Sequence, residues 1–347
     1  MTSAAQARPP PASRDDFQIA IICALPEERD TVEVLMARDY KSERGGYGAA
    51  RGDDNTYMLG ELGGKPVVLV TPRNIGTINT SHLASNMRFS FPNLTWTFVV
   101  GIAGGAPFDR NMQPSSIHLG DVLVSTQVIG YDFGAEYDDM FQSKTAVEDV
   151  LPRAPALVAN FLNTLKTGRS KAFGRVLAGT QQELANFAQF GEEYQCPAPE
   201  TDRVYESNHR HKHQDATACE ICSEGQEWHH QICDEAMKAP CEKLGCQALL
   251  TRQKRDPSIH FGRIASGNAV MKSARRRDIL IQRQDCIGFE MEGAGTWEGV
   301  VDYADSHKNK TWRFYPAARA ALCVQALIEE IELPAMSQSM YGLGESP

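Results

Sequence analysis

The sequence predicts an α/β fold in which a mainly parallel or mixed central sheet is flanked by helices. Short apolar segments rich in β-branched residues alternate with segments of helical pattern, and several of the apolar segments end in glycine-rich turns. Strands of this kind are buried on both faces, and ligands bind at their carboxyl ends. With 347 residues, of which 42% are hydrophobic, the chain can bury one large core.

The first strand is expected within residues 17–25, which are apolar and largely β-branched. Pro26 ends this strand and suits the first turn of a helix through Leu35. Glu27 and Glu28 fall in that first turn, where the helix dipole favours carboxylates. Further strands are expected at residues 65–71, 97–100, 121–126 and 259–267, and further helices at 77–90 and 316–331 and in the region 157–189.

The composition changes sharply after the middle of the chain. Residues 194–256 are rich in Cys, His, Glu and Lys and lack a sustained apolar period, which predicts an insertion at about 190–258. We expect one domain over residues 15–335, with disordered tails at 1–14 and 336–347.

The charge balance argues against nucleic acid and membrane partners. A formal net charge of −9 repels phosphate backbones and anionic lipid headgroups. No stretch approaches the length of a membrane span, and the Ala- and Pro-rich start lacks the apolar run of a signal peptide. We therefore expect a soluble, cytoplasmic protein whose nine cysteines are mainly reduced.

Carboxyl groups stand out at three places. Cleavage of an N-glycosidic bond needs a nucleophile, a stabilised sugar cation and a neutralised leaving base, and carboxyl groups can supply all three. Glu28 can activate a water or simply occupy a helix start. Glu290 and Glu292 lie two residues apart, so both would face one sugar in an extended segment, unless they form a solvated acidic run. Asp302 can protonate a purine ring nitrogen if its pKa is raised, or it is a turn residue.

The glycine-rich turn at 101–105 brings backbone close to a ligand, although tight packing also demands glycine. The turn lacks the spacing of a dinucleotide fingerprint or of a phosphate loop with lysine. No cofactor is therefore expected.

Seven short motifs occur in order over most of the chain: Ala24-Leu25-Pro26-Glu27-Glu28, Asn74-Ile75-Gly76-Thr77, Gly101-Ile102-Ala103-Gly104-Gly105, Leu119-Gly120-Asp121-Val122-Leu123-Val124-Ser125, Ile264-Ala265-Ser266-Gly267-Asn268, Phe289-Glu290-Met291-Glu292-Gly293 and Asp302-Tyr303-Ala304-Asp305-Ser306-His307. Together they resemble the nucleoside phosphorylase and nucleosidase superfamily, and within it the fungal purine-nucleosidase-like domains. The resemblance implies a three-layer fold, a purine nucleoside as small-molecule partner, and a homo-oligomer.

The resemblance also implies roles for individual residues. Glu28 matches the water-activating glutamate of the hydrolytic branch, and Asp302 matches the acid at the purine. The remaining matches are Glu292, Glu290 and Met291 at the ribose, Ala103 and Gly104 through backbone, and Val270 and Met271 at the base.

Hydrolysis is favoured over phosphorolysis. Related phosphorylases place an arginine after the first strand, where this chain has Glu28, and a carboxylate there repels phosphate while suiting water. We therefore expect a purine nucleosidase that releases free base and ribose. Phosphorolysis is the alternative, and Arg73 is the residue that would favour it.

A third possibility is a catalytically impaired nucleoside-binding protein. In the family, a helix and a buried strand separate the residues that match Glu292 and Asp302. Such elements need about fifteen residues plus a turn, but only the short segment 293–301 is present. Either Val300 and Val301 are all that remains of the strand or a piece of the chain is missing, and the position of Asp302 depends on which holds.

The insertion contains soft metal ligands. Cys219 and Cys222 have metal-ligand spacing, and they are followed by further candidates that have no clean second pair: His229, His230, Cys233, Cys241 and Cys246. A structural zinc site is one interpretation, and reduced cysteines in a surface loop are the other. The histidine-rich run 209–213 is interpreted as solvated loop. We expect no metal among the functional residues.

Overall fold

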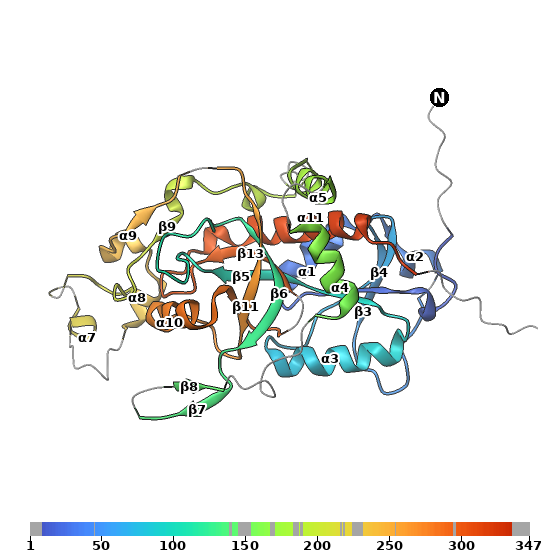
Figure 1. The fold of residues 1–347 in the computed structure, drawn as a ribbon, viewed down its shortest axis with the longest axis horizontal. Helices are drawn as coiled ribbons and strands as arrows, with labels where there is room; N and C mark the ends of the chain where they lie inside the picture. The colour runs from blue at the N-terminus through green and yellow to red at the C-terminus, as the bar shows by residue number, and fades with distance from the viewer. Residues whose placement is uncertain are drawn as a thin grey trace, which may run out of the picture.

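A nine-stranded sheet forms the middle layer of the computed structural model (Figure 1). The structure describes residues 9–44, 46–138, 141–144, 154–166, 171–182, 187, 190–215, 217, 219–223, 232–253, 255–293 and 296–334. In spatial order, the strands of the sheet are β12 (Cys286–Glu290), β11 (Ile259–Ser266), β6 (Val122–Gly130), β13 (Thr296–Asp302), β5 (Trp96–Gly105), β1 (Ile19–Ile22), β4 (Lys65–Val70), β3 (Tyr57–Leu62) and β2 (Arg38–Asp39).

The sheet is mixed. Strand β1 runs parallel to both β4 and β5, and β11 runs parallel to both β6 and β12. Strand β13 is parallel to β5 but antiparallel to β6, and β3 is antiparallel to both β2 and β4. The expected α/β class is confirmed.

Helices cover both faces of the sheet (Figure 1). In β1, Ile19 and Ile21 face the core cluster that contains Leu327, while the alternating residues Ala20 and Ile22 face a second cluster, as the period of a strand requires. One face is covered by α1 (Pro26–Leu35), α4 (Ala156–Leu165), α5 (Lys171–Gln182) and α11 (Phe314–Glu330), and the other by α3 (Thr77–Ser90) and α10 (Ala274–Gln284).

The segment before Asp302 forms more strand than the sequence predicted. Strand β13 has seven residues and lies between β5 and β6. Trp297 packs edge-on against Phe98 with ring centroids 4.7 Å apart, and Val300 is fully buried. The interpretation of Val300 and Val301 as the whole remaining strand was therefore wrong, because residues 296–299 were counted as connection. Residues 294 and 295 lie outside the described part, and the rest of the connection from β12 is not helical.

The insertion folds into short elements. These are β9 (Arg203–Val204), β10 (Leu250–Thr251), α7 (Glu220–Ser223), α8 (Asp234–Lys238) and α9 (Cys241–Leu244). Of the expected tails, residues 1–8 and 335–347 lie outside the described part. Residues 9–14 are described, and Pro11 accepts a 2.8 Å hydrogen bond from the Tyr47 hydroxyl. Within the described residues, no helix has the length and apolar character that a bilayer crossing demands.

Candidate active site

A cavity of about 440 Å³ opens at the carboxyl ends of β1, β5, β12 and β13. This is the position at which α/β sheets bind ligands. The structure brings every residue expected at the site to the wall of this one cavity: Glu28, Ala103, Gly104, Val270, Met271, Glu290, Met291, Glu292 and Asp302.

Glu28 lies in the first turn of α1 and also lines the cavity. It is the third residue of α1, and its carboxylate accepts hydrogen bonds from the backbone N–H of Leu25 at 2.9 Å and of Ile102 at 3.1 Å. A Cβ atom on Gly101 would lie 2.7 Å from Glu28 Oε1. The glycine-rich end of β5 is therefore required for the carboxylate to approach the backbone.

Burial controls the charge of Glu28, which is only 3% exposed. It raises the pKa of Glu28 to about 8; the hydrogen bond from Leu25 lowers the pKa, and the nearby Glu292 raises it further. Within the described residues, Glu28 forms no salt bridge. Its carboxyl group is therefore mostly neutral at pH 7 and becomes a base as the pH rises.

Glu290 and Glu292 are not two residues of one extended segment. Strand β12 ends at Glu290, and Met291 and Glu292 form a bend. The Glu290 carboxylate causes this bend, because it accepts hydrogen bonds from the backbone N–H of Glu292 and, at 3.0 Å, of Gly293. The argument that strand alternation points both carboxylates to one side was therefore wrong, although both residues line the cavity.

Burial also raises the pKa values of this pair. The pKa of Glu290 rises to about 8 because the residue is buried and lies beside Glu292. The pKa of Glu292 is raised by burial, and one of its oxygens accepts a 3.1 Å hydrogen bond from the N–H of Met291. This wall of the cavity thus carries several carboxyl groups that accept hydrogen bonds from backbone N–H groups.

Asp302 forms an ion pair with Lys308. It ends β13, and both of its carboxylate oxygens accept from Lys308 Nζ, at 2.9 and 2.8 Å. The backbone N–H of Ala304 donates to Asp302 at 2.8 Å. Lys308 also lines the cavity, and sequence reasoning missed it. Its place directly after the motif that ends at His307 was the available signal.

An aromatic wall was missed as well. Tyr131 and Phe289 both line the cavity, and their rings meet edge to face with centroids 6.3 Å apart. The Tyr131 hydroxyl donates to the carbonyl oxygen of Ala269, which holds the ring beside Val270 and Met271. A flat base fits against such a surface.

Arg73, the arginine that would favour phosphorolysis, lies away from the cavity. Arg73 does not line the cavity; it pairs with Asp54 at 3.3 Å and its side chain is 83% exposed. Arg313 does line it, and its guanidinium pairs with Glu27, the neighbour of Glu28. In the described part of the chain, the groups of His and Cys side chains suited to a metal are formed by the insertion together with His307, and none of these side chains lines the cavity.

The chain is similar in sequence to part of a much longer protein. At 28% identity over 338 residues, the chain is similar to a nucleotide-binding leucine-rich repeat (NLR)-like protein of Hyaloscypha variabilis. The alignment covers 92% of this chain but only 30% of the length of that relative. The chain therefore spans less than a third of that protein.

Solved nucleosidase structures share the architecture. The 5′-methylthioadenosine/S-adenosylhomocysteine nucleosidase of Helicobacter pylori superposes with a TM-score of 0.51 at 13% identity, covering 91% of this chain and 99% of that one. The futalosine hydrolase of Helicobacter pylori gives 0.50 at 15% identity, covering 92% and 100%. At such identities the likeness establishes the fold, and the expected three-layer arrangement is confirmed.

The sequence identifies the family directly. Residues 18–192, half of the chain, match the family described as the phosphorylase superfamily. This match includes the strands and turns that carry Glu28, Ala103 and Gly104. The chain belongs to the phosphorylase superfamily.

Proposed function

We propose that this protein hydrolyses the N-glycosidic bond of a purine nucleoside and releases the free base and ribose. One observation carries the proposal: the buried Glu28 carboxyl group faces the same cavity as Glu290, Glu292 and Asp302 without a salt bridge of its own among the described residues. In their ionised forms, the nearby carboxyl groups would repel an anionic nucleophile, whereas they suit a neutral water.

The reaction follows from the chemistry of these groups. A water oxygen bonds to C1′ of the sugar while the bond from C1′ to the purine nitrogen breaks, and ionised Glu28 takes the proton that the water loses. Glu292 accepts hydrogen bonds from the ribose hydroxyls. Asp302 is the proposed acid at the purine: in its protonated form it gives its proton to the purine nitrogen that keeps the electron pair of the broken bond. Lys308 must release Asp302 before the carboxylate takes up that proton, since the two form an ion pair.

The aromatic wall supports a purine substrate. Tyr131, Phe289 and Met271 form an apolar surface beside the polar end of β13. Nucleosidases for 5′-methylthioadenosine and for futalosine share the fold, which is compatible with the proposal. The homo-oligomer, the cytoplasmic location and the single domain over 15–335 remain predictions.

Phosphorolysis remains the second candidate because of Arg313. This arginine lines the cavity, and its Nε has no hydrogen-bond partner among the described residues. Its ion pair with Glu27 occupies part of the guanidinium. Phosphate would have to displace that carboxylate and lie close to Glu28, whose ionised form would repel it.

The test is a substrate panel with product analysis in the presence and absence of phosphate. Adenosine, inosine, guanosine and 5′-methylthioadenosine are incubated with the protein, and chromatography identifies the free base together with the free sugar or its 1-phosphate; the sugar from 5′-methylthioadenosine is 5-methylthioribose. We expect the free sugar at a rate independent of phosphate, and loss of the reaction in Glu28→Gln. Turnover that requires phosphate, and that Arg313→Gln abolishes, would show the phosphorylase reaction instead.

A further inference from the structure

Cys and His side chains of the insertion, together with His307, form two compact groups. The first contains His211, Cys241, Cys246 and His307, and the second contains His213, Cys219, Cys222 and Cys233. Within each group, one ligand atom from every residue lies within 4.8 Å of all the others. We propose that each group binds one zinc ion, so that the protein carries two structural zinc sites.

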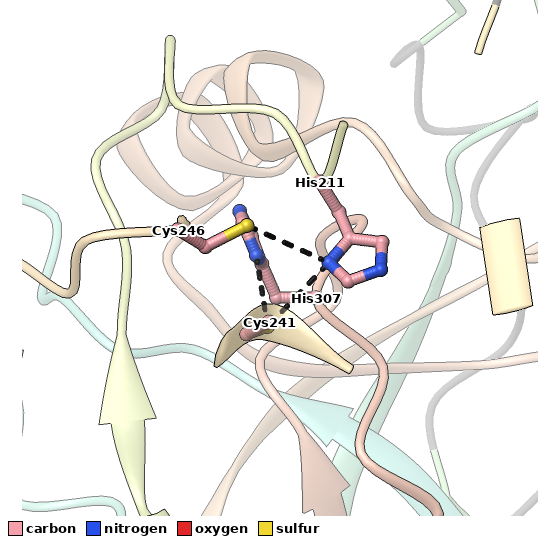
Figure 2. A group of neighbouring side chains, drawn as sticks. All are labelled: His211, Cys241, Cys246 and His307. Carbon is pink, nitrogen blue, oxygen red and sulfur yellow. Dashed lines mark hydrogen bonds between the residues drawn. The ribbon is translucent and has the colours of Figure 1, made fainter. Parts of the chain in front are cut away.

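The first group, site A, has the dimensions of a tetrahedral zinc site. Figure 2 shows the ring of His211 turned toward the sulfur atom of Cys246, with a dashed line from the ring also leading to Cys241. His211 Nδ1 lies 3.4 Å from Cys241 Sγ and 3.8 Å from Cys246 Sγ, and His307 Nδ1 lies 3.6 Å from Cys241 Sγ. Bonds of about 2.0 Å to nitrogen and about 2.3 Å to sulfur place tetrahedral ligands about 3.6 Å apart. These three separations match those between ligands of one tetrahedral zinc ion.

The histidines of site A are oriented as metal ligands. His211 Nε2 lies 3.0 Å from the carbonyl oxygen of Ala239, and His307 Nε2 lies 2.9 Å from that of His209. A carbonyl oxygen accepts from N–H, so the proton of each ring resides on Nε2 and the lone pair of Nδ1 points to the centre of the group. Metal-ligating histidines are held in this way by their outer partners. Tyr205 stacks on His307 at a centroid distance of 3.6 Å and fixes the ring plane.

The second group, site B, combines one histidine with three cysteines. Cys219 and Cys222 are separated by two residues, the spacing of zinc-binding cysteine pairs. Cys233 Sγ lies 3.6 Å from His213 Nδ1 and accepts from the backbone N–H of Ala236 at 3.3 Å, as the N-cap of α8. N–H donors of this kind stabilise thiolate sulfur. Soft sulfur and imidazole ligands in a tetrahedron select zinc over magnesium or calcium.

The two sites share one short segment. His211 and His213 are two residues apart, and each contributes to a different group. The solvated loop expected at 209–213 is therefore wrong, since both rings pack against cysteines. The candidates His229 and His230 lie outside the described residues. The two-site proposal extends the structural-zinc interpretation of the insertion from one possible site to two.

Site A joins the insertion to the catalytic side of the domain. His307 is outside the insertion; it lies five residues after Asp302 and directly before Lys308. Strand β13 holds one end of the segment that carries the ion pair of Asp302 and Lys308, and a zinc ion at site A would hold the other. Site B lies wholly within the insertion. The expected effect of site A on the cavity rests on the proposed function, whereas the proposal of zinc binding does not.

The test is zinc content, measured by mass spectrometry on the full chain purified without chelator. We expect about two zinc ions per chain. Cys241→Ser and Cys219→Ser are each expected to retain one, and the double variant none. Cys196→Ser is the matched control, because Cys196 lies in the insertion but in neither group, and it should retain both. His307→Cys keeps a ligand and should also retain both.

Variants that fail to fold do not decide the question, so the wild-type protein provides a second measurement. After zinc is exchanged for cobalt, each site should give the visible absorption of tetrahedral thiolate-bound Co²⁺, saturating at about two equivalents. Less than about a tenth of an equivalent of zinc in protein expressed with added zinc would overturn the proposal. Disulfides in place of the metal would overturn it as well.

The expected effect of site A on the cavity is tested by the KM of the nucleoside. We expect Cys241→Ser to raise the KM of the nucleoside severalfold, because the Asp302 segment loses its anchor, and Cys219→Ser to leave KM within about twofold. If the wild-type protein bound two zinc ions but cleaved no nucleoside, the proposed function would fail while the zinc sites would stand.

Discussion

The two sides of the cavity satisfy their carboxyl groups in different ways. On the side of β1 and β12, Glu28 and Glu290 accept hydrogen bonds from backbone N–H groups. On the side of β13, Asp302 is held by the ammonium group of Lys308. Backbone donors carry no net charge and only partly offset burial, so the pKa values of Glu28 and Glu290 rise to about 8.

The two sides of the cavity therefore have different roles in the proposed reaction. With a pKa of about 8, the Glu28 carboxyl group gains and loses a proton in the physiological pH range, as a base that activates water must. The side of Asp302 depends on a cation that comes from the segment following β13, and that segment ends in the zinc ligand proposed at site A. Proton transfer at one side and positioning at the other can therefore be disrupted separately.

Removal of the Glu28 charge is expected to have the largest effect. Glu28→Gln keeps the shape of the side chain but cannot take a proton from water, so kcat/KM should fall by about 10² to 10⁴. Steady-state release of base measures this loss. Glu33→Gln on the exposed side of the same helix is the control and should be indistinguishable from wild type. A Glu28→Gln variant with more than half of the wild-type activity would rule out water activation by this residue.

Asp302→Asn should have a smaller effect that depends on the leaving group. Without the acid, kcat for inosine is expected to fall by about ten- to a hundredfold, the low end of general acid catalysis. For 4-nitrophenyl riboside, whose leaving group needs no proton, the loss should be less than about threefold. Equal losses on both substrates would mean that Asp302 positions the substrate and does not supply a proton.

The pH dependence should distinguish the two sides further. Because Glu28 must be ionised and its pKa is raised to about 8, kcat/KM is expected to rise about tenfold per pH unit below pH 8 and to level off above it. Initial rates between pH 5.5 and 9.5 test this expectation. The residual activity of Glu28→Gln should lack the rise. A wild-type profile that is flat over this range would show that substrate binding removes the effect of burial.

The sequence predicted the fold and the residues around the cavity because their signals are local. The apolar run at 17–25, the proline at the start of α1 and the glycines of β5 each follow from the geometry of one strand and its turn. Lys308 directly follows the motif that ends at His307, but its ion pair with Asp302 is seen only in the structure. The aromatic wall of Tyr131 depends on how distant segments pack, so no local pattern indicated it. The same holds for site A, where His307 is separated from His211 by most of the insertion.

The segment before Asp302 shows where a local pattern failed. Sequence spacing suggested a lost strand, whereas residues 296–302 form one between β5 and β6. The consequence is a polar residue in the core: Glu298 is 1% exposed, and neither of its carboxyl oxygens has a hydrogen-bond partner in the described part of the chain. Glu298 is a third kind of carboxyl group, with neither a backbone donor nor a cation.

Glu298→Leu is therefore expected to stabilise the protein, and this is the smallest of the effects considered. Replacing an unsatisfied buried polar group by an apolar one of similar size gains about 1 kcal/mol. Burial raises the pKa of Glu298 well above its usual value. A group whose pKa is raised on folding destabilises the folded state increasingly as the pH rises above the unfolded-state pKa. The gain should therefore be larger at pH 8 than at pH 5, as urea unfolding at both pH values can measure. A loss of stability at both would mean that Glu298 has a partner that the leucine cannot replace.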